Sequence, residues 1–332
     1  MPSQDTTDPR SGFFAIGQQT FHEACALGIN AASAFLVLAR GTGPDNATTS
    51  WSAKAVRERA AVRNRTAVEA IQALVTARLA KKSGTVARPK YKLHRDGDLI
   101  WLPNAIVDGV GAEKPPVARI RETQDVMLLR MFIDLYSAQN LAEDGGIDPY
   151  QFQSNYSRRR VGQRGAWIVW AFSGTGLNGH WTPITEPHRL EKPEDGENSS
   201  TVLWNRVRRL ESFGLISWVP YVFDGPEGEP MYAVVPNSGI PIEQDVYAAC
   251  EEAVVQMLTD NQYEIALEKG GELVPVPAHV EQAQLIGIAR LRYRPHTGMT
   301  KAWWANHQET CLQLLRDLAP YTGYEEGQTD AA

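Results

Sequence analysis

Residues 56–79 read VRERAAVRNRTAVEAIQALVTARL and contain two helical patterns separated by a short polar turn. Ser52 suits the N-cap of a first helix over residues 53–61, because its hydroxyl can accept from the free N–H groups of the first turn. The second pattern continues to about Lys82 and repeats apolar residues at intervals of three and four, which is typical of an amphipathic helix. Its apolar stripe consists of Val68, Ile71, Leu74, Val75 and Leu79.

The segments on either side of this helix pair extend the pattern. Residues 31–40, AASAFLVLAR, are almost entirely apolar and predict a buried helix, and residues 48–51 predict a short strand. Downstream, residues 86–93 and 99–103 flank a turn at 94–98 and predict a β-hairpin. The order helix, strand, helix, turn, helix and hairpin is that of a winged helix-turn-helix.

Residues 56–79 also resemble the winged helix-turn-helix of bacterial regulators of the GntR and MarR kind. There, a helix ending in an apolar residue leads to a turn rich in Ser, Arg and Thr, and then to Ala, an apolar residue and Leu in the next helix. Here these positions are Val62, residues 63–66, Ala70, Ile71 and Leu74, with Leu79 at a further leucine of the family. Two positions depart from the pattern, since Ala61 and Arg78 stand where the family has glycine. The resemblance covers about 60–80 residues around this helix pair and implies binding to DNA, without indicating which genes are regulated.

The charge distribution points the same way. The formal net charge is −6 at pH 7. Residues 54–95, however, contain 12 Lys and Arg residues against 2 Glu residues, so this segment carries +10 and the remainder −16. A compact basic region in an acidic protein is typical of a localised phosphate-binding surface.

The second helix of a helix-turn-helix enters the major groove with its N-terminal end first. On its outward face an arginine can bridge O6 and N7 of guanine, a glutamine can pair with adenine, and a glutamate can accept from cytosine. Cations on the preceding helix and on the hairpin are placed for phosphates. The predicted DNA-binding residues are Lys54, Arg57, Arg63, Asn64, Arg65, Thr66, Glu69, Gln72, Arg88, Lys90, Lys92 and Arg95.

A proline-containing linker, residues 110–117, precedes a second region. Residues 124–139 predict a helix, residues 150–160 a further helix, residues 166–172 a buried strand and residues 173–198 an exposed loop. Residues 199–223 resemble the last helix and first wing strand of another winged helix. The turn that follows, residues 224–229, is acidic and would be repelled by phosphates. We therefore predict that this second region serves folding or dimerisation, with direct contact to DNA as the alternative.

The remainder of the chain predicts helices over residues 243–268, 280–292 and 300–318. The predicted fold is therefore mainly α with small β wings, as tandem winged helix-turn-helix domains plus a helical C-terminal region. The predicted divisions are a disordered leader (residues 1–12), a winged-helix DNA-binding domain (13–109), a second, divergent winged-helix-like domain (118–236), a helical C-terminal region (241–320) and a tail (321–332).

Three short motifs resemble enzyme signatures. Residues 174–179, GTGLNG, match a dinucleotide-binding fingerprint, but no helix follows to receive the pyrophosphate. Residues 94–96, HRD, lack the asparagine that a kinase catalytic loop requires. His22 and Glu23 lack the second histidine of a zinc-binding helix. The three cysteines, Cys25, Cys250 and Cys311, offer no metal spacing. We predict no enzymatic activity, cofactor or metal ion.

The sequence thus predicts a cytoplasmic, sequence-specific double-stranded DNA-binding protein, a transcriptional regulator acting as a homodimer. Neither a signal peptide nor a run of about 18 apolar residues suggests a membrane partner. Two alternatives stay open. One is a replication-initiator-type protein of a plasmid or mobile element, because such initiators also combine two winged helices. The other is a winged-helix scaffold that binds proteins, against which the basic segment argues.

Overall fold

A computed structural model describes residues 12–85, 88–189, 199–225, 228–236, 240–294 and 297–322. Nearly all of the predicted leader and most of the predicted tail lie outside these residues. The chain folds into two compact units. Unit 1 contains residues 1–139, 181–215 and 291–295, and unit 2 contains the rest. None of the described helices is both long enough and apolar enough to cross a membrane.

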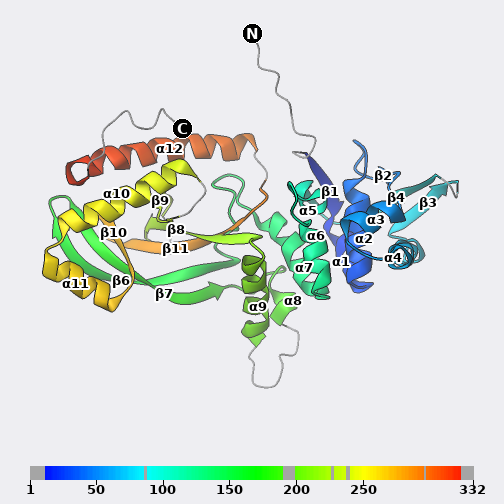
Figure 1. Ribbon diagram of the computed structural model, residues 1–332, viewed down its shortest axis with the longest axis horizontal. Helices are drawn as coiled ribbons and strands as arrows, with labels where there is room; N and C mark the ends of the chain where they lie inside the picture. Colours follow the sequence, from blue (N-terminus) through cyan, green and yellow to red (C-terminus); the bar gives the residue numbers. More distant parts are fainter. Residues whose placement is uncertain are drawn as a thin grey trace, which may run out of the picture. The chain divides into compact units, whose positions relative to one another are not determined.

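Unit 1 is built mainly from helices (Figure 1). Its helices are α1 (Gln18–Ala26), α2 (Ile29–Arg40), α3 (Ala53–Arg59), α4 (Asn64–Thr76), α5 (Ala105–Asp108), α6 (Pro116–Glu122), α7 (Val126–Asp134), α8 (Glu186–Arg189) and α9 (Ser199–Ser212). Its strands are β1 (Phe13–Gly17), β2 (Thr48–Thr49), β3 (Ala80–Gly84), β4 (Pro89–Leu93) and β5 (Leu99–Pro103).

Helix α2 is the centre of unit 1. Every residue from Ala31 to Ala39 is buried, as the nearly continuous apolar sequence predicts. The helix packs against α1, α3, α4 and α6. It therefore supports the helix pair α3 and α4 from behind and leaves their other faces to solvent.

Residues 29–93 follow the predicted order of helix, strand, two helices and a hairpin. A three-stranded antiparallel sheet has the order β2-β4-β3, so the short strand β2 adds to the β3–β4 hairpin. The hairpin follows α4 directly and is called the wing from here on. The wing differs from the sequence prediction in its strands. Its strands are residues 80–84 and 89–93, whereas β5 pairs with β1.

The cause of this shift lies at the end of α4, which stops at Thr76 rather than at about Lys82. Arg78 adopts a left-handed conformation with φ 63°, and the Leu79 N–H donates to the Leu74 carbonyl at 2.9 Å. This pattern ends the helix and frees Lys81 and Lys82 for β3. Strand β5 then pairs with Phe13–Gly17, which contributes Phe14, Ala15 and Ile16 to the core.

Unit 2 is dominated by a six-stranded antiparallel sheet with the order β10-β7-β6-β11-β8-β9. The strands are β6 (Phe152–Arg164), β7 (Trp167–Gly179), β8 (Ile216–Asp224), β9 (Pro230–Ala233), β10 (Glu272–Pro277) and β11 (Ala283–Leu291). The helices are α10 (Pro241–Met257), α11 (Asp260–Lys269) and α12 (Gly298–Leu318). Helices α10 and α12 lie side by side (Figure 1), and their apolar residues join those of the sheet in one core.

This sheet overturns the predicted fold class. The structure is about 45% helix and 27% strand, and is not a mainly α protein with small wings. Residues 152–160 lie in β6 rather than a helix, residues 173–179 extend β7 rather than forming a loop, and residues 283–291 form β11. The β8–β9 hairpin does form, but it belongs to the large sheet and is not a separate wing. The predicted tandem of winged-helix domains and the wholly helical C-terminal region are therefore wrong.

The pattern of burial explains why periodicity failed here. Strand β11, AQLIGIARL, is buried at all but its second residue, so it shows no alternation of polar and apolar residues. A short apolar run of this kind cannot be distinguished from a buried helix by periodicity. Strand β6 is the opposite case, because its polar sequence is held mainly by pairing with β7 along its whole length.

Unit 2 encloses a buried charged cluster consisting of Asp144, Glu243 and Arg290, each at most 3% exposed. The Arg290 Nε donates to Asp144 Oδ2 at 2.8 Å, and an Nη donates to Glu243 Oε1 at 3.0 Å. The guanidinium also lies over the rings of Tyr221 and Trp304, at 5.1 and 5.0 Å from their centroids. One arginine therefore compensates two carboxylates and joins β11 to α10.

A buried histidine gives unit 1 a pH-dependent stability. The Nδ1 atom of His188 lies 3.0 Å from an Nη of Arg206, which itself pairs with Asp125. Burial, and next the Arg206 charge, lower the pKa of His188 from 6.5 to about 4. The unfolded chain therefore takes up a proton below pH 6.5 that the folded chain resists, so stability falls as the pH drops from 6.5 towards 4.

We expect wild-type unit 1 to lose about 2 kcal/mol between pH 7 and pH 5 through His188. In the variant His188→Asn, the amide oxygen can still accept from Arg206 but cannot titrate. Its denaturation midpoint should therefore change less with pH than that of the wild type. Equal pH dependence of the two proteins in urea titrations would contradict the assignment.

Candidate nucleic-acid interface

Helix α4 presents a polar stripe to solvent. Its buried residues are Ala67, Ala70, Ile71 and Leu74, which pack towards α2 and α3. The exposed residues on the opposite side follow helical spacing and consist of Arg65, Val68, Glu69, Gln72 and Thr76. Arg63 and Asn64 are also exposed at the N-terminal end of the helix, and Thr66 is half-buried.

Val68 corrects the predicted apolar stripe. Its side chain is 50% exposed, although the sequence prediction placed it in the core. The core position is taken by Ala67, which is fully buried one residue earlier. An alanine is a weak indicator of burial, because it is common both inside and on the surface of helices. The sequence pattern therefore predicted burial for the larger and more hydrophobic Val68 instead.

Two side-chain pairs run along the exposed stripe. The Arg65 Nε donates to Glu69 Oε1 at 2.7 Å, one helical turn further on. The Gln72 amide donates to the Thr76 hydroxyl at 3.4 Å. The carboxylate of Glu69 raises the pKa of Arg65. Such an exposed ion pair contributes little to stability, so the arginine can exchange Glu69 for a ligand.

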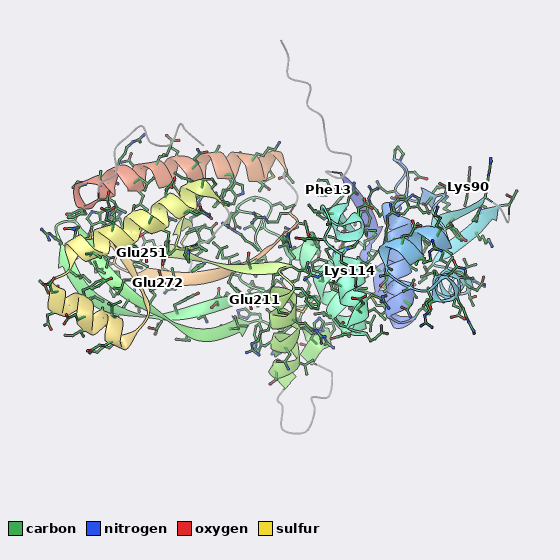
Figure 2. All side chains as sticks on the ribbon, viewed as in Figure 1. Phe13, Lys90, Lys114, Glu211, Glu251 and Glu272 are labelled. Atoms are coloured by element: carbon green, nitrogen blue, oxygen red, sulfur yellow. The ribbon has the colours of Figure 1, made fainter. Side chains whose placement is uncertain are left out.

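The outer face of the wing concentrates positive charge. Lys81 and Lys92 lie directly opposite each other in the β3–β4 register, and Ser83 faces Lys90. Like charges at opposite positions of a sheet destabilise it. Lys90 lies near the outer end of the wing (Figure 2), and Arg88 is exposed in the adjoining turn. An anion bound here would relieve the repulsion among these lysines.

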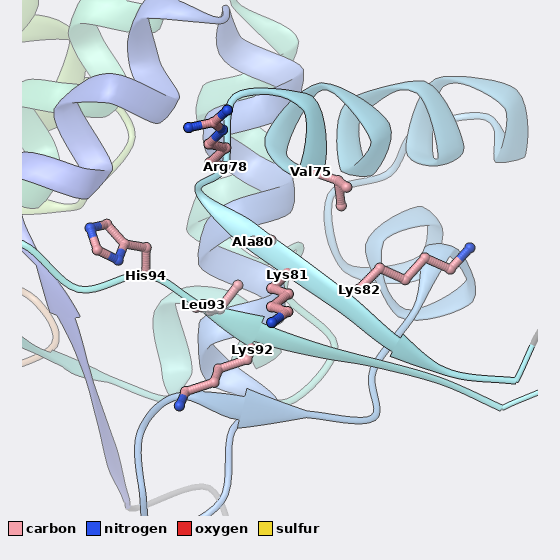
Figure 3. Close-up of a pocket in the computed structure, with 8 residues that line it drawn as sticks. All are labelled: Val75, Arg78, Ala80, Lys81, Lys82, Lys92, Leu93 and His94. Carbon is pink, nitrogen blue, oxygen red and sulfur yellow. The ribbon is translucent and has the colours of Figure 1, made fainter.

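A concavity of about 550 Å³ lies between the C-terminal end of α4 and the wing (Figure 3). Its floor is apolar, formed by Val75, Ala80 and Leu93. Its polar lining consists of Arg78, Lys81, Lys82, Lys92 and His94. Arg78, Lys81 and Lys82 are not among the site residues predicted from the sequence, because the helical pattern places them in the last turns of the helix.

Four cations of the basic segment lie outside both the exposed face of α4 and the wing. Arg95 is exposed in the connection from β4 to β5 rather than in the turn of the wing. Arg57 is exposed on α3 beside Glu58, at 3.3 Å, and Lys54 is exposed on the same helix. Arg59 contributes to the charge count but pairs with Asp108 at 3.0 Å and lies over the Trp51 ring. That arginine joins α3 to α5.

The two positions that depart from the family pattern both have left-handed backbones. Ala61, in the turn between α3 and α4, has φ 51°, and Arg78 has φ 63°. Glycine is favoured at such angles because other L-residues bring their Cβ close to the backbone. The turn between α3 and α4 and the end of α4 therefore form without glycine, at a cost in backbone strain.

Ala61→Gly should consequently stabilise unit 1. Relief of a left-handed conformation is worth about 1–2 kcal/mol, and the greater freedom of glycine in the unfolded chain removes about 0.5–1 kcal/mol, so the net gain is about 0.5–1 kcal/mol. Ala73→Gly makes the same chemical change inside α4 and should destabilise by a similar amount. Chemical denaturation of both variants measures whether each substitution raises or lowers the free energy of unfolding. Destabilisation by Ala61→Gly would contradict the strain argument.

The three motifs that resemble enzyme signatures lie in a strand or in side-chain pairs within unit 1 and unit 2. Residues 174–179 form the end of β7. His22 Nε2 lies 2.7 Å from Asp134 Oδ1 and connects α1 to α7. His94 pairs with Asp96 at the surface, at 2.9 Å. Across the described ranges, no three His, Cys, Asp or Glu side chains converge as ligands for a metal ion.

No family model, no curated protein and no solved structure matches this chain.

Proposed function

We propose that this chain is a sequence-specific double-stranded DNA-binding protein that acts as a cytoplasmic transcriptional regulator. The observation that carries the proposal is the exposed stripe of α4, bordered by the basic wing. The stripe offers the donors and acceptors that read base edges in a major groove. The wing offers a separate group of lysines for phosphates, which carry no sequence information.

The topology around these surfaces supports the same function. Helix α4 is held on the far side by α2, so its position is set by the core of unit 1. Residues 77–79 alone separate the end of α4 at Thr76 from the start of β3 at Ala80, so the helix and the wing keep a defined spacing. A reading helix on a rigid support is what base recognition requires, because a displaced hydrogen-bond donor loses its selectivity.

We further propose that the protein binds as a homodimer. A twofold dimer would present two α4 helices to successive turns of the major groove and would select a palindromic site. Sedimentation of the protein at micromolar concentration, with and without the selected duplex, measures the assembly. A monomer of 36.8 kDa in both conditions would exclude the dimer.

The experiment that tests the function is selection from a library of random duplexes, followed by mapping of the enriched sequence onto the parent genome. Enrichment of one motif is the expected result, and an occurrence at the protein's own promoter would identify a regulator. Repeated occurrences at the origin of a plasmid or mobile element would instead identify a replication initiator. Absence of any enriched motif, with binding equal on all duplexes, would refute sequence-specific recognition.

A further inference from the structure

Val68 is the apolar member of an otherwise polar reading surface. Among the large hydrophobic residues described between positions 48 and 93, Val68 alone is more than one third exposed. We propose that Val68 is a specificity-determining residue that contacts the C5-methyl group of a thymine. The inference rests on the proposed function, because it requires that the exposed face of α4 contacts the bases of DNA.

The neighbours of Val68 show why this position differs from an isolated surface valine, which by itself needs no explanation. Arg65 precedes it by one helical turn, and Gln72 follows it by one turn. Arg65 is paired with Glu69, and Gln72 with Thr76, in hydrogen bonds that run along the helix. Val68 therefore lies among the residues of two polar pairs and is half exposed to solvent.

The chemistry of the major groove supplies a partner for them. Adenine, guanine and cytosine present hydrogen-bonding atoms there, whereas thymine also presents a methyl group. Contact between that methyl group and Val68 would remove apolar surface of both from water. Lengthening or charging this side chain would not improve such a contact, since no hydrogen bond is involved.

The spacing along α4 also locates the thymine. Val68 follows Arg65 by three residues, which corresponds to about 4.5 Å along the helix axis. Base pairs are stacked about 3.4 Å apart. If Arg65 bridges a guanine, the thymine read by Val68 lies within one or two base pairs of that guanine.

The test uses the full-length protein and the duplex enriched by selection. Each thymine is replaced in turn by deoxyuridine, which removes only the methyl group. At one thymine of each half-site we expect wild-type affinity to fall about fourfold, the value of one buried methyl group. In Val68→Ala the same replacement should cost less than about twofold, because the side chain no longer reaches the base.

Val110→Ala is the matched control, since Val110 is 45% exposed and lies in unit 1 outside the helix pair. This variant should retain the wild-type response to deoxyuridine. The inference is overturned if wild-type protein binds its site selectively but no thymine shows the loss, or if Val68→Ala shows the same loss. If no duplex is enriched in the first place, the proposed function fails and the inference fails with it. Thermal melting of each variant verifies that α4 remains folded.

Discussion

Replacing Arg290 with methionine is expected to destabilise unit 2 by about 3–5 kcal/mol, the usual cost of breaking a buried ion pair. The variant leaves the carboxylates of Asp144 and Glu243 buried without their shared cation, while the methionine retains much of the apolar stem. His307 Nε2 lies 3.5 Å from Glu243 Oε1 and remains in place in the variant. The variant is therefore expected to unfold at a markedly lower denaturant concentration.

Arg292→Met is the control for this prediction. Arg292 pairs with Glu113 at 2.9 Å, but both side chains are more than 40% exposed. Exposed pairs contribute about 0–1 kcal/mol, so this variant should resemble the wild type. Urea denaturation followed by tryptophan fluorescence compares the two. Equal midpoints for the two variants would show that the buried cluster is not required for the stability of unit 2.

Arg65→Ala is expected to cost about 1–3 kcal/mol of specific DNA affinity, the usual value of a bidentate base contact. The Arg65 side chain is 90% exposed and its ion pair with Glu69 lies in solvent. The folded state should therefore change by no more than about 0.5 kcal/mol. Discrimination at one base pair should be relaxed, because the arginine carries sequence information.

Lys90→Ala should behave differently, since a phosphate contact contributes equally on every sequence. It should weaken binding to specific and scrambled duplexes alike and reduce the slope of log affinity against log salt concentration by about one. Salt titrations of both variants on both duplexes separate the two roles. Unchanged binding by both, with folding intact, would place the DNA-contacting surface elsewhere.

The helix-turn-helix part of unit 1 could be read from the sequence because its signals are local. The polar turn at residues 63–66, the spacing of Ala70, Ile71 and Leu74, and the cluster of cations all act within a few turns of one helix. The structure places α3, α4 and a basic hairpin there. The sequence prediction was wrong at Val68, because the neighbouring Ala67 occupies the core position. It was also wrong about the end of α4, because the left-handed Arg78 ends the helix early.

Unit 2 shows what local patterns could not decide. The six strands of its sheet are spread over 140 residues of the chain, from Phe152 at the start of β6 to Leu291 at the end of β11. A polar strand such as β6 is stabilised by the strands beside it, and a fully buried strand such as β11 has no alternating face to reveal it. The buried position of Arg290 likewise depends on carboxylates contributed by distant segments. Composition and helical periodicity therefore determined helix α4 and the positive charge around it, whereas strand pairing across the whole chain decided the sheet, because its stabilising contacts exist only between segments brought together by folding.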